Sequence, residues 1–224
     1  MKILAVDTAL GACSVAILDG DRVLAHRLVA MERGHAEALA PMVERAMADT
    51  GIGFAALDRL AVTTGPGTFT GQRVGLAFMR GLRLALKRPL VGVTTLEAMA
   101  AAALSESGAP AAAVLHDAKR DEVYVAAVTA TGVLLPVQIQ PFETAIDCLA
   151  ALPAGFALAG TAAAAAAARL ESRGIAVVGT SIIQPDALWV ARLALAAPEP
   201  EGPPRPLYLR APDAKLPSRP GAEP

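Results

Sequence analysis

The residue types best suited to chemistry gather in the glycine- and threonine-rich run 63–76, which follows an apolar segment and opens a helical pattern. Gly65-Pro66-Gly67 predicts a tight turn, because glycine accepts a positive φ and proline fixes its own φ. Thr68 or Thr70 can then cap the first free N–H groups of the helix, and such a helix start can hold a phosphate. The spacing matches no nucleotide motif, since a dinucleotide fingerprint needs glycine at position 70 and a P-loop needs a Gly-Lys pair.

We therefore favour a packing role over a ligand loop for this run. Gly71, Gly75 and Gly81 remove bulk from a helix that runs to about residue 86, so another backbone can approach it closely. Phe78 and Met79 add apolar contacts at helical spacing. The pattern predicts that Gly75 faces a binding partner.

The other reactive residue types form no recognisable catalytic, cofactor or metal motif. His26, His35 and His116 lie far apart and make no HxxxH or HExxH pair, which disfavours a metal site. Cys13 lies in an apolar strand pattern where a thiol is inert, and the sequence has no GxSxG elbow. We predict no catalytic, cofactor-binding or metal-binding residues, although a site assembled across the fold stays open.

Composition indicates a globular chain without an independent nucleic-acid site. The 224 residues are 54% hydrophobic and carry a formal net charge of -1, which suits one large or two small domains. The mean hydropathy of +0.46 comes from alanine rather than from an apolar run of membrane-spanning length. Asp7 comes too early for a secretory signal, so we expect a cytoplasmic protein in which Cys13 and Cys148 are reduced.

The hydrophobic pattern predicts two halves with the same order of elements. Strands are expected at 2–7, 12–18, 22–30, 59–64 and 90–93 in the first half, and at 111–116, 122–128, 133–139, 156–159 and 175–178 in the second. Helices are expected at about 35–47, 70–86, 94–104, 142–151, 162–173 and 186–197. The order βββαβαβα in each half indicates a mixed α/β sheet covered by helices, and an internal duplication.

We therefore divide the chain into residues 1–104, 105–197 and a proline-rich tail, 198–224. The boundary follows a polar, proline-terminated segment. The tail is expected to be extended, lying either along the body or loose in solvent. Its apolar and aromatic patch at 206–210 could anchor it to the body.

Two βββαβαβα halves are typical of the actin-like (ASKHA) fold, a duplication of RNase H-like domains in which each first hairpin holds phosphate. Here the first hairpin keeps Asp7 and Thr8 but has its glycine late, and the second, 117–122, has none. Bulky side chains keep backbone amides from a pyrophosphate, so a working ATP cleft is disfavoured. Asp7 could equally be a strand-end acid satisfied by local N–H groups.

Five motifs together resemble the bacterial TsaB family, formerly called YeaZ, over nearly the whole chain. They are the residues 3–8, 35–41, 65–75, 117–124 and 208–210. Where the family usually has a serine this chain has Thr68, and where it usually has a leucine this chain has Gln72. The long proline-rich tail of this chain is also unusual for the family.

The resemblance implies a non-catalytic subunit required to make threonylcarbamoyladenosine at position 37 of tRNA. The implied protein partners are the catalytic paralogue TsaD, the ATPase TsaE and a second copy of the chain. The resemblance implies that tRNA is contacted only indirectly and that no membrane is contacted. ATP or ADP could bind at the partner interface. The implied interface lies on two helices of the first half and comprises His35, Leu39, Met42, Val43, Met47, Phe69, Gly71, Gln72, Arg73, Gly75, Phe78 and Met79. Asp7 and Thr8 would be the remnant of a phosphate hairpin. The rival hypothesis is an enzyme, either an actin-like ATPase or kinase or a metallopeptidase-like protein.

Overall fold

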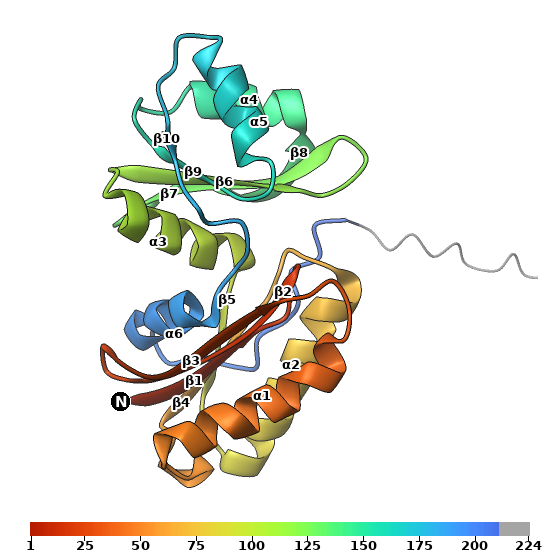
Figure 1. Ribbon diagram of the computed structural model, residues 1–224, viewed down its shortest axis with the longest axis vertical. Helices are drawn as coiled ribbons and strands as arrows, with labels where there is room; N and C mark the ends of the chain where they lie inside the picture. Colours follow the sequence, from red (N-terminus) through yellow and green to blue (C-terminus); the bar gives the residue numbers. More distant parts are fainter. Residues whose placement is uncertain (211–224) are drawn as a thin grey trace, which may run out of the picture.

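The computed structural model describes residues 1–210, which form two α/β lobes stacked along the long axis of the molecule (Figure 1). Residues 211–224 of the predicted tail lie outside the described part. From the N-terminus the elements are β1 (Lys2–Asp7), β2 (Ala12–Asp19), β3 (Arg22–Ala30), α1 (His35–Thr50), the 3-10 turn η1 (Phe54–Ala56), β4 (Arg59–Thr63), α2 (Phe69–Leu86), β5 (Leu90–Val93) and α3 (Thr95–Ser107). The second series is β6 (Ala111–Asp117), β7 (Glu122–Thr129), β8 (Val133–Pro141), α4 (Phe142–Ala150), β9 (Ala157–Ala159), α5 (Ala163–Glu171), β10 (Val178–Gly179) and α6 (Ala187–Ala196).

The two sheets described in residues 1–210 have the same topology. The strand orders are β3-β2-β1-β4-β5 and β8-β7-β6-β9-β10. In each sheet the first three strands pair antiparallel and the last two are added in parallel. This repeat confirms the predicted duplication.

Local sequence signals account for most element ends. Gly20 has a φ of 57° and so makes the tight hairpin turn between β2 and β3 possible. Thr68 caps α2, as predicted, by accepting a hydrogen bond from the Gly71 N–H at 3.0 Å. Thr94 and Glu97 form the predicted capping box at the start of α3. The strand predicted at 175–178 is largely absent, because Ile175 and Val177 pack on the second core from an irregular segment and only β10 pairs.

The middle layer of the molecule differs from the sequence prediction. Figure 1 shows α3 and α6 side by side between the two sheets, with α1 and α2 below and α4 and α5 above. Helix α3, from the first half of the chain, packs on β6, β7 and β9, whereas α6, from the second half, packs on β1, β2 and β4. The predicted boundary at residue 104 falls inside α3, and each of these two helices covers the sheet of the other half of the chain.

The described part of the tail, residues 198–210, runs back along the first lobe without regular secondary structure. The Leu207 N–H donates to the Thr64 carbonyl at 2.8 Å, and Pro204 lies against Gly92 of β5. This confirms the predicted anchoring by residues 206–210. Within residues 1–210 no helix combines the length and the apolar character needed to cross a bilayer.

Candidate partner-binding face

The first hairpin is joined to α2 by the hydroxyl of Thr8. Its Oγ1 donates to the Gly71 carbonyl at 2.7 Å and accepts from the Gly75 N–H at 3.0 Å, the two groups that a regular helix would pair with each other. A Cβ at position 71 would lie 2.1 Å from the Thr8 carbonyl oxygen, and one at 75 would lie 2.7 Å from Thr8 Oγ1. Both glycines are therefore required by the chain's own hairpin, which corrects the prediction that Gly75 faces a partner.

The same junction fills the position where a phosphate hairpin would need free amides. The Thr68 N–H donates to the Ala9 carbonyl at 2.8 Å, and a Cβ on Gly67 would lie 2.3 Å from that oxygen. Gln72 is also buried here, with its Nε2 donating to the Gly67 carbonyl at 3.0 Å. The glycine loop thus packs on its own hairpin, as the preference for a packing role predicted.

Asp7 is buried beside this junction. Its Oδ1 accepts hydrogen bonds from Thr63 Oγ1 at 2.6 Å and from the Ala9 N–H at 3.2 Å, whereas Oδ2 is buried without a partner. Burial raises the pKa of Asp7 to about 7 against these two hydrogen bonds, with a smaller contribution from the negative charge of Asp186. The carboxyl group is therefore partly protonated at neutral pH. Its Oδ1 is held by local donors, as expected for a strand-end acid.

The second hairpin turns through three consecutive left-handed residues. Lys119, Arg120 and Asp121 have φ values of 65°, 59° and 57°. The Asp117 carboxylate accepts from the Lys119 N–H at 2.8 Å, and this bond lowers the pKa of Asp117. Arg210 of the tail donates to the Ala118 carbonyl at 3.1 Å and pairs with Glu122. The side chains at this turn are thus engaged with one another and with the tail.

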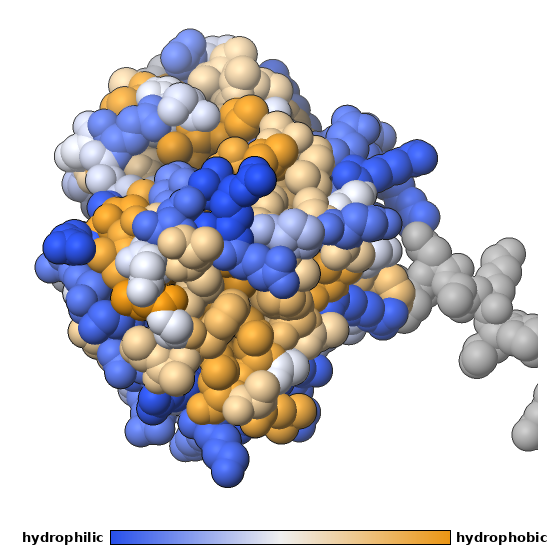
Figure 2. All heavy atoms as spheres, turned by 60° about the horizontal axis from the view of Figure 1, so that its bottom comes forward, coloured by the Kyte–Doolittle hydropathy of each residue, from blue (hydrophilic) through white to orange (hydrophobic). Residues whose placement is uncertain are grey.

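Helices α1 and α2 form the outer face of the first lobe, and apolar side chains gather on it (Figure 2). Phe69 is 50% exposed and Leu84 is 72% exposed. Met42 and Phe78 are half-buried on the same two helices. We call this surface, made by Met42, Phe69, Arg73, Phe78 and Leu84, the α1–α2 face.

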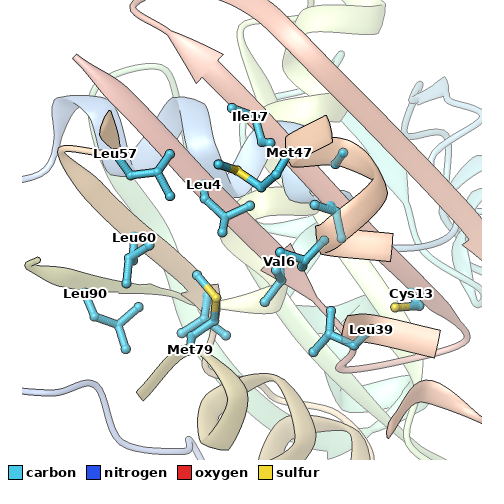
Figure 3. Packing of buried hydrophobic residues seen from close by; sticks show 14 of the residues in the cluster. Leu4, Val6, Cys13, Ile17, Leu39, Met47, Leu57, Leu60, Met79 and Leu90 are labelled. Atoms are coloured by element: carbon cyan, nitrogen blue, oxygen red, sulfur yellow. The ribbon is translucent and has the colours of Figure 1, made fainter. Parts of the chain in front are cut away.

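The structure divides the predicted interface residues into two groups. Met42, Phe69, Arg73 and Phe78 reach the surface. The others are buried within the chain and cannot touch a partner directly: His35, Leu39, Val43, Met47, Gly71, Gln72, Gly75 and Met79. Figure 3 shows Leu39, Met47 and Met79 among Leu4, Val6 and Leu60 of the sheet. His35 is fixed by a 3.0 Å contact between Nε2 and the Leu10 carbonyl. These side chains shape the face from beneath.

The tail adds an aromatic residue that the predicted interface did not include. The Tyr208 ring stacks on Phe69 with 5.7 Å between centroids, and its hydroxyl accepts a hydrogen bond from Arg73 Nε at 2.8 Å. The Arg73 guanidinium lies 3.3 Å from the centroid of the Phe69 ring. The sequence signal for this contact was the aromatic patch at 206–210, which predicted an anchor but not its position.

Among residues 1–210, no three histidine, cysteine or acidic side chains come together in a way that could hold a metal ion. The histidines predicted to be scattered occupy separate places. His26 binds Asp186, the N-cap residue of α6, at 2.8 Å; His35 lies at the start of α1, and His116 is on β6.

Comparisons with known proteins identify the family. The family model for TsaD, tRNA N6-adenosine threonylcarbamoyltransferase, matches residues 26–170. The tRNA threonylcarbamoyladenosine biosynthesis protein TsaB of Escherichia coli is 40% identical over 124 residues, which cover 55% of this chain and 53% of that protein. The structure of YeaZ from Pseudomonas aeruginosa matches with a TM-score of 0.77 and 31% identity over 93% of this chain and 99% of that one.

The chain belongs to the TsaB (YeaZ) family. This confirms the resemblance carried by the five motifs. The chain spans about half the length of the E. coli TsaB protein. A second structure from Pseudomonas aeruginosa, a protein with similarity to the peptidase YeaZ, matches with a TM-score of 0.78 and 30% identity.

Membership of the TsaB family places the chain in the actin-like (ASKHA) fold that its two lobes predicted. Component A of (R)-2-hydroxyglutaryl-CoA dehydratase from Acidaminococcus fermentans shares this fold, with a TM-score of 0.53 and 11% identity over 86% of this chain and 97% of that one. In this TsaB-family chain the 65–75 motif is the junction of hairpin and α2, and the motif at 208–210 contributes Tyr208 and Arg210.

Proposed function

We propose that this chain is a non-catalytic subunit in the biosynthesis of threonylcarbamoyladenosine at position 37 of tRNA. In this role it binds and activates a threonylcarbamoyltransferase of the TsaD type through the α1–α2 face. The names of the TsaB relatives support the pathway. The match to the TsaD model supports a partner with the same fold, because paralogous chains can pair about a pseudo-twofold axis.

The exposure of large apolar side chains on α2 is the observation that carries the proposal. Phe69 and Leu84 are 50% and 72% exposed, and Ala77, Gly81 and Ala85 extend an exposed row of small residues along the same helix. Such a row allows the backbone of a second helix to approach. A contiguous apolar surface of this kind is typical of a protein interface, and about 800 Å² per partner gives a stable complex.

The positive charge of α2 restricts the kind of partner surface that can bind it. Arg73, Arg80 and Arg83 lie on this helix, which has no acidic residue between Phe69 and Leu86. A complementary partner would bring carboxylates or carbonyl groups against the cationic side chains. A second copy of the chain, which has Glu37 and Glu44 on α1, competes for the same face in this proposal. The TsaE ATPase would join the assembled pair, with any ATP or ADP held at the interface, and tRNA would be contacted only indirectly.

The non-catalytic role is supported by the first hairpin, where two polar groups are already hydrogen-bonded within the chain. The Thr8 hydroxyl is used by Gly71 and Gly75, and the Ala9 carbonyl receives the Thr68 N–H. A phosphate would meet a carbonyl oxygen there rather than free amides, and this repulsion disfavours binding.

The first test measures complex formation with the TsaD-type transferase of the same organism by light scattering after size-exclusion chromatography. The wild-type chain is expected to form a complex. Arg73→Glu is expected to lower the affinity at least about tenfold, because the new negative charge would face the acidic surface that complements Arg73. Val133→Ala, which truncates a 62% exposed side chain on β8 of the other lobe, is the matched control. Undiminished binding by Arg73→Glu, or no binding by the wild type, would contradict the proposed face.

The second test addresses the rival, an actin-like ATPase or kinase or a metallopeptidase-like enzyme. The purified chain with Mg²⁺ and ATP is expected to show no turnover above a buffer control. Turnover that disappears in Asp7→Ala would overturn the non-catalytic role.

A further inference from the structure

The tail residues 204–210 are fixed on the two lobes by contacts that do not involve the ring of Tyr208. Arg80 donates to the Pro204 carbonyl, and the Leu207 N–H donates to the Thr64 carbonyl at 2.8 Å. Arg210, two residues beyond Tyr208, binds the Ala118 carbonyl of the second lobe at 3.1 Å. The backbone on both sides of Tyr208 is therefore held without help from its side chain.

The Tyr208 ring is nevertheless placed on Phe69, the first residue of α2. It stacks on Phe69 at an interplanar angle of 29°. The Arg73 guanidinium lies over the Phe69 ring, 3.3 Å from its centroid, and is 5.6 Å from the centroid of Tyr208. Nε of Arg73 also donates to the tyrosine hydroxyl at 2.8 Å. These contacts fix Arg73, a long side chain that would otherwise lose conformational freedom on binding.

This stack leaves much of its own surface exposed. Phe69 is 50% exposed and Tyr208 is 43% exposed, so about half of each residue still faces water. Aromatic residues that pack for stability are normally much more buried. Tyrosine and arginine are among the residues that dominate binding energy in protein interfaces, and phenylalanine is enriched at interface cores.

We propose that Tyr208 is an interface residue, and that Phe69, Arg73 and Tyr208 form one composite anchor for a partner of the TsaD family. The inference rests on the proposed function, and it adds a segment from the far end of the chain to a face otherwise made by α1 and α2. The TsaD-type partner is favoured because the family model matches residues 26–170, a range that contains both helices, so the partner has corresponding helices to pack here. Its surface opposite Arg73 would be acidic.

The experiment measures the dissociation constant of the full-length chain and the TsaD-type transferase by calorimetry. Tyr208→Ala is expected to weaken binding about 30-fold, the size of a typical hot-spot effect. Tyr208→Phe keeps the ring and is expected to lose less than about fivefold. Arg205→Ala, at another exposed tail position, is the matched control and is expected to bind like the wild type.

A double variant tests whether Phe69 and Tyr208 act as one composite anchor or make independent contacts with the partner. Phe69→Ala with Tyr208→Ala is expected to lose little more affinity than the larger of the two single losses, because each removes support from the same group. The thermal midpoint of Tyr208→Ala is expected to stay close to that of the wild type, since the flanking backbone keeps its hydrogen bonds.

The outcomes distinguish this inference from the proposed function. If the wild type does not bind the transferase, the proposed function fails and the inference with it. If the wild type binds and Tyr208→Ala binds equally well, the inference alone is overturned. It is also overturned if Tyr208→Ala changes only the self-association of the chain, because the occupant would then be a second copy.

Discussion

Asp7 and Thr8 are adjacent in the first hairpin, and their side chains have different environments. Thr8 satisfies both its donor and its acceptor on α2, through Gly71 and Gly75. Asp7 leaves one carboxylate oxygen buried and unpaired, and its pKa is raised to about 7. A neutral acid is stable in this environment, whereas an ionised one is not. The hairpin thus keeps the residue types of a phosphate site but uses them for packing.

This difference predicts a pH dependence of stability that Asp7→Asn removes. Because the pKa of Asp7 is higher in the folded chain than its ordinary value of 3.8, the folded state binds the proton more tightly. Its contribution is fully present below pH 3.8 and is lost as the pH rises through about 7. The increase in the pKa of Asp7 from 3.8 to about 7 corresponds to a change of about 4 kcal/mol in the free energy of unfolding, an order-of-magnitude figure at about 1.4 kcal/mol for each pKa unit.

Urea unfolding between pH 5 and pH 8 checks this prediction. Asp7→Asn is expected to be more stable than the wild type at pH 8, because asparagine can still accept from Thr63 and carries no charge. Asp21→Asn, at an exposed turn, is the control and is expected to keep the wild-type slope. Equal slopes for wild type and Asp7→Asn would show that Asp7 does not titrate in this range.

At the scale of the element, the glycines of α2 separate into those that touch the hairpin and one that does not. A Cβ at Gly71 would lie 2.1 Å from a backbone oxygen, which cannot move as a side chain could. Gly81 has nothing within 4 Å of its Cβ position and is exposed. The same residue type is therefore required at one position of the helix and unfavourable at another.

Gly71→Ala is expected to destabilise the chain by about 3 kcal/mol, since it forces the hairpin and the helix apart. Gly81→Ala is the matched control in the same helix and is expected to stabilise it by about 0.5–1 kcal/mol through helix propensity. Thermal or urea unfolding of both variants measures the difference. A Gly71→Ala chain as stable as the wild type would show that the close contact with Thr8 is relieved without cost.

The sequence predicted the elements of the first lobe better than their environment. Helical periodicity placed Leu39, Val43 and Met47 on one face of α1, and that face is apolar as expected. Periodicity cannot state whether an apolar face meets the chain's own sheet or another molecule, because both remove it from water. The partner-facing residues are instead found by exposure, which requires the tertiary structure. Tyr208 joins Phe69 over a sequence separation that no local pattern describes.

At the scale of the whole molecule, the two lobes are tied together by exchanged helices. Helix α6 covers Ile3, Ala16 and Val91 of the first sheet, and Met99 of α3 packs with the second. His26 on β3 binds Asp186 at the start of α6, and Arg59 donates to the Ala194 and Ala197 carbonyls at its end. Neither lobe has a complete set of covering helices from its own half of the chain. Sequence order could not show this exchange, because α3 and α6 are each apolar enough to cover either sheet.

We therefore expect the chain to unfold as one cooperative unit rather than as two domains. Trp189 lies on α6 at the first sheet, so its fluorescence reports the layer between the lobes, while circular dichroism reports all helices. If unfolding is two-state, the two signals change with the same midpoint and slope in urea. Ala191→Gly weakens the buried part of α6. It is expected to lower the free energy of unfolding by about 1 kcal/mol or more, and so to lower both midpoints together. A fluorescence transition that precedes the circular dichroism transition would mean that α6 detaches before the lobes unfold, and that the exchange of helices does not couple them.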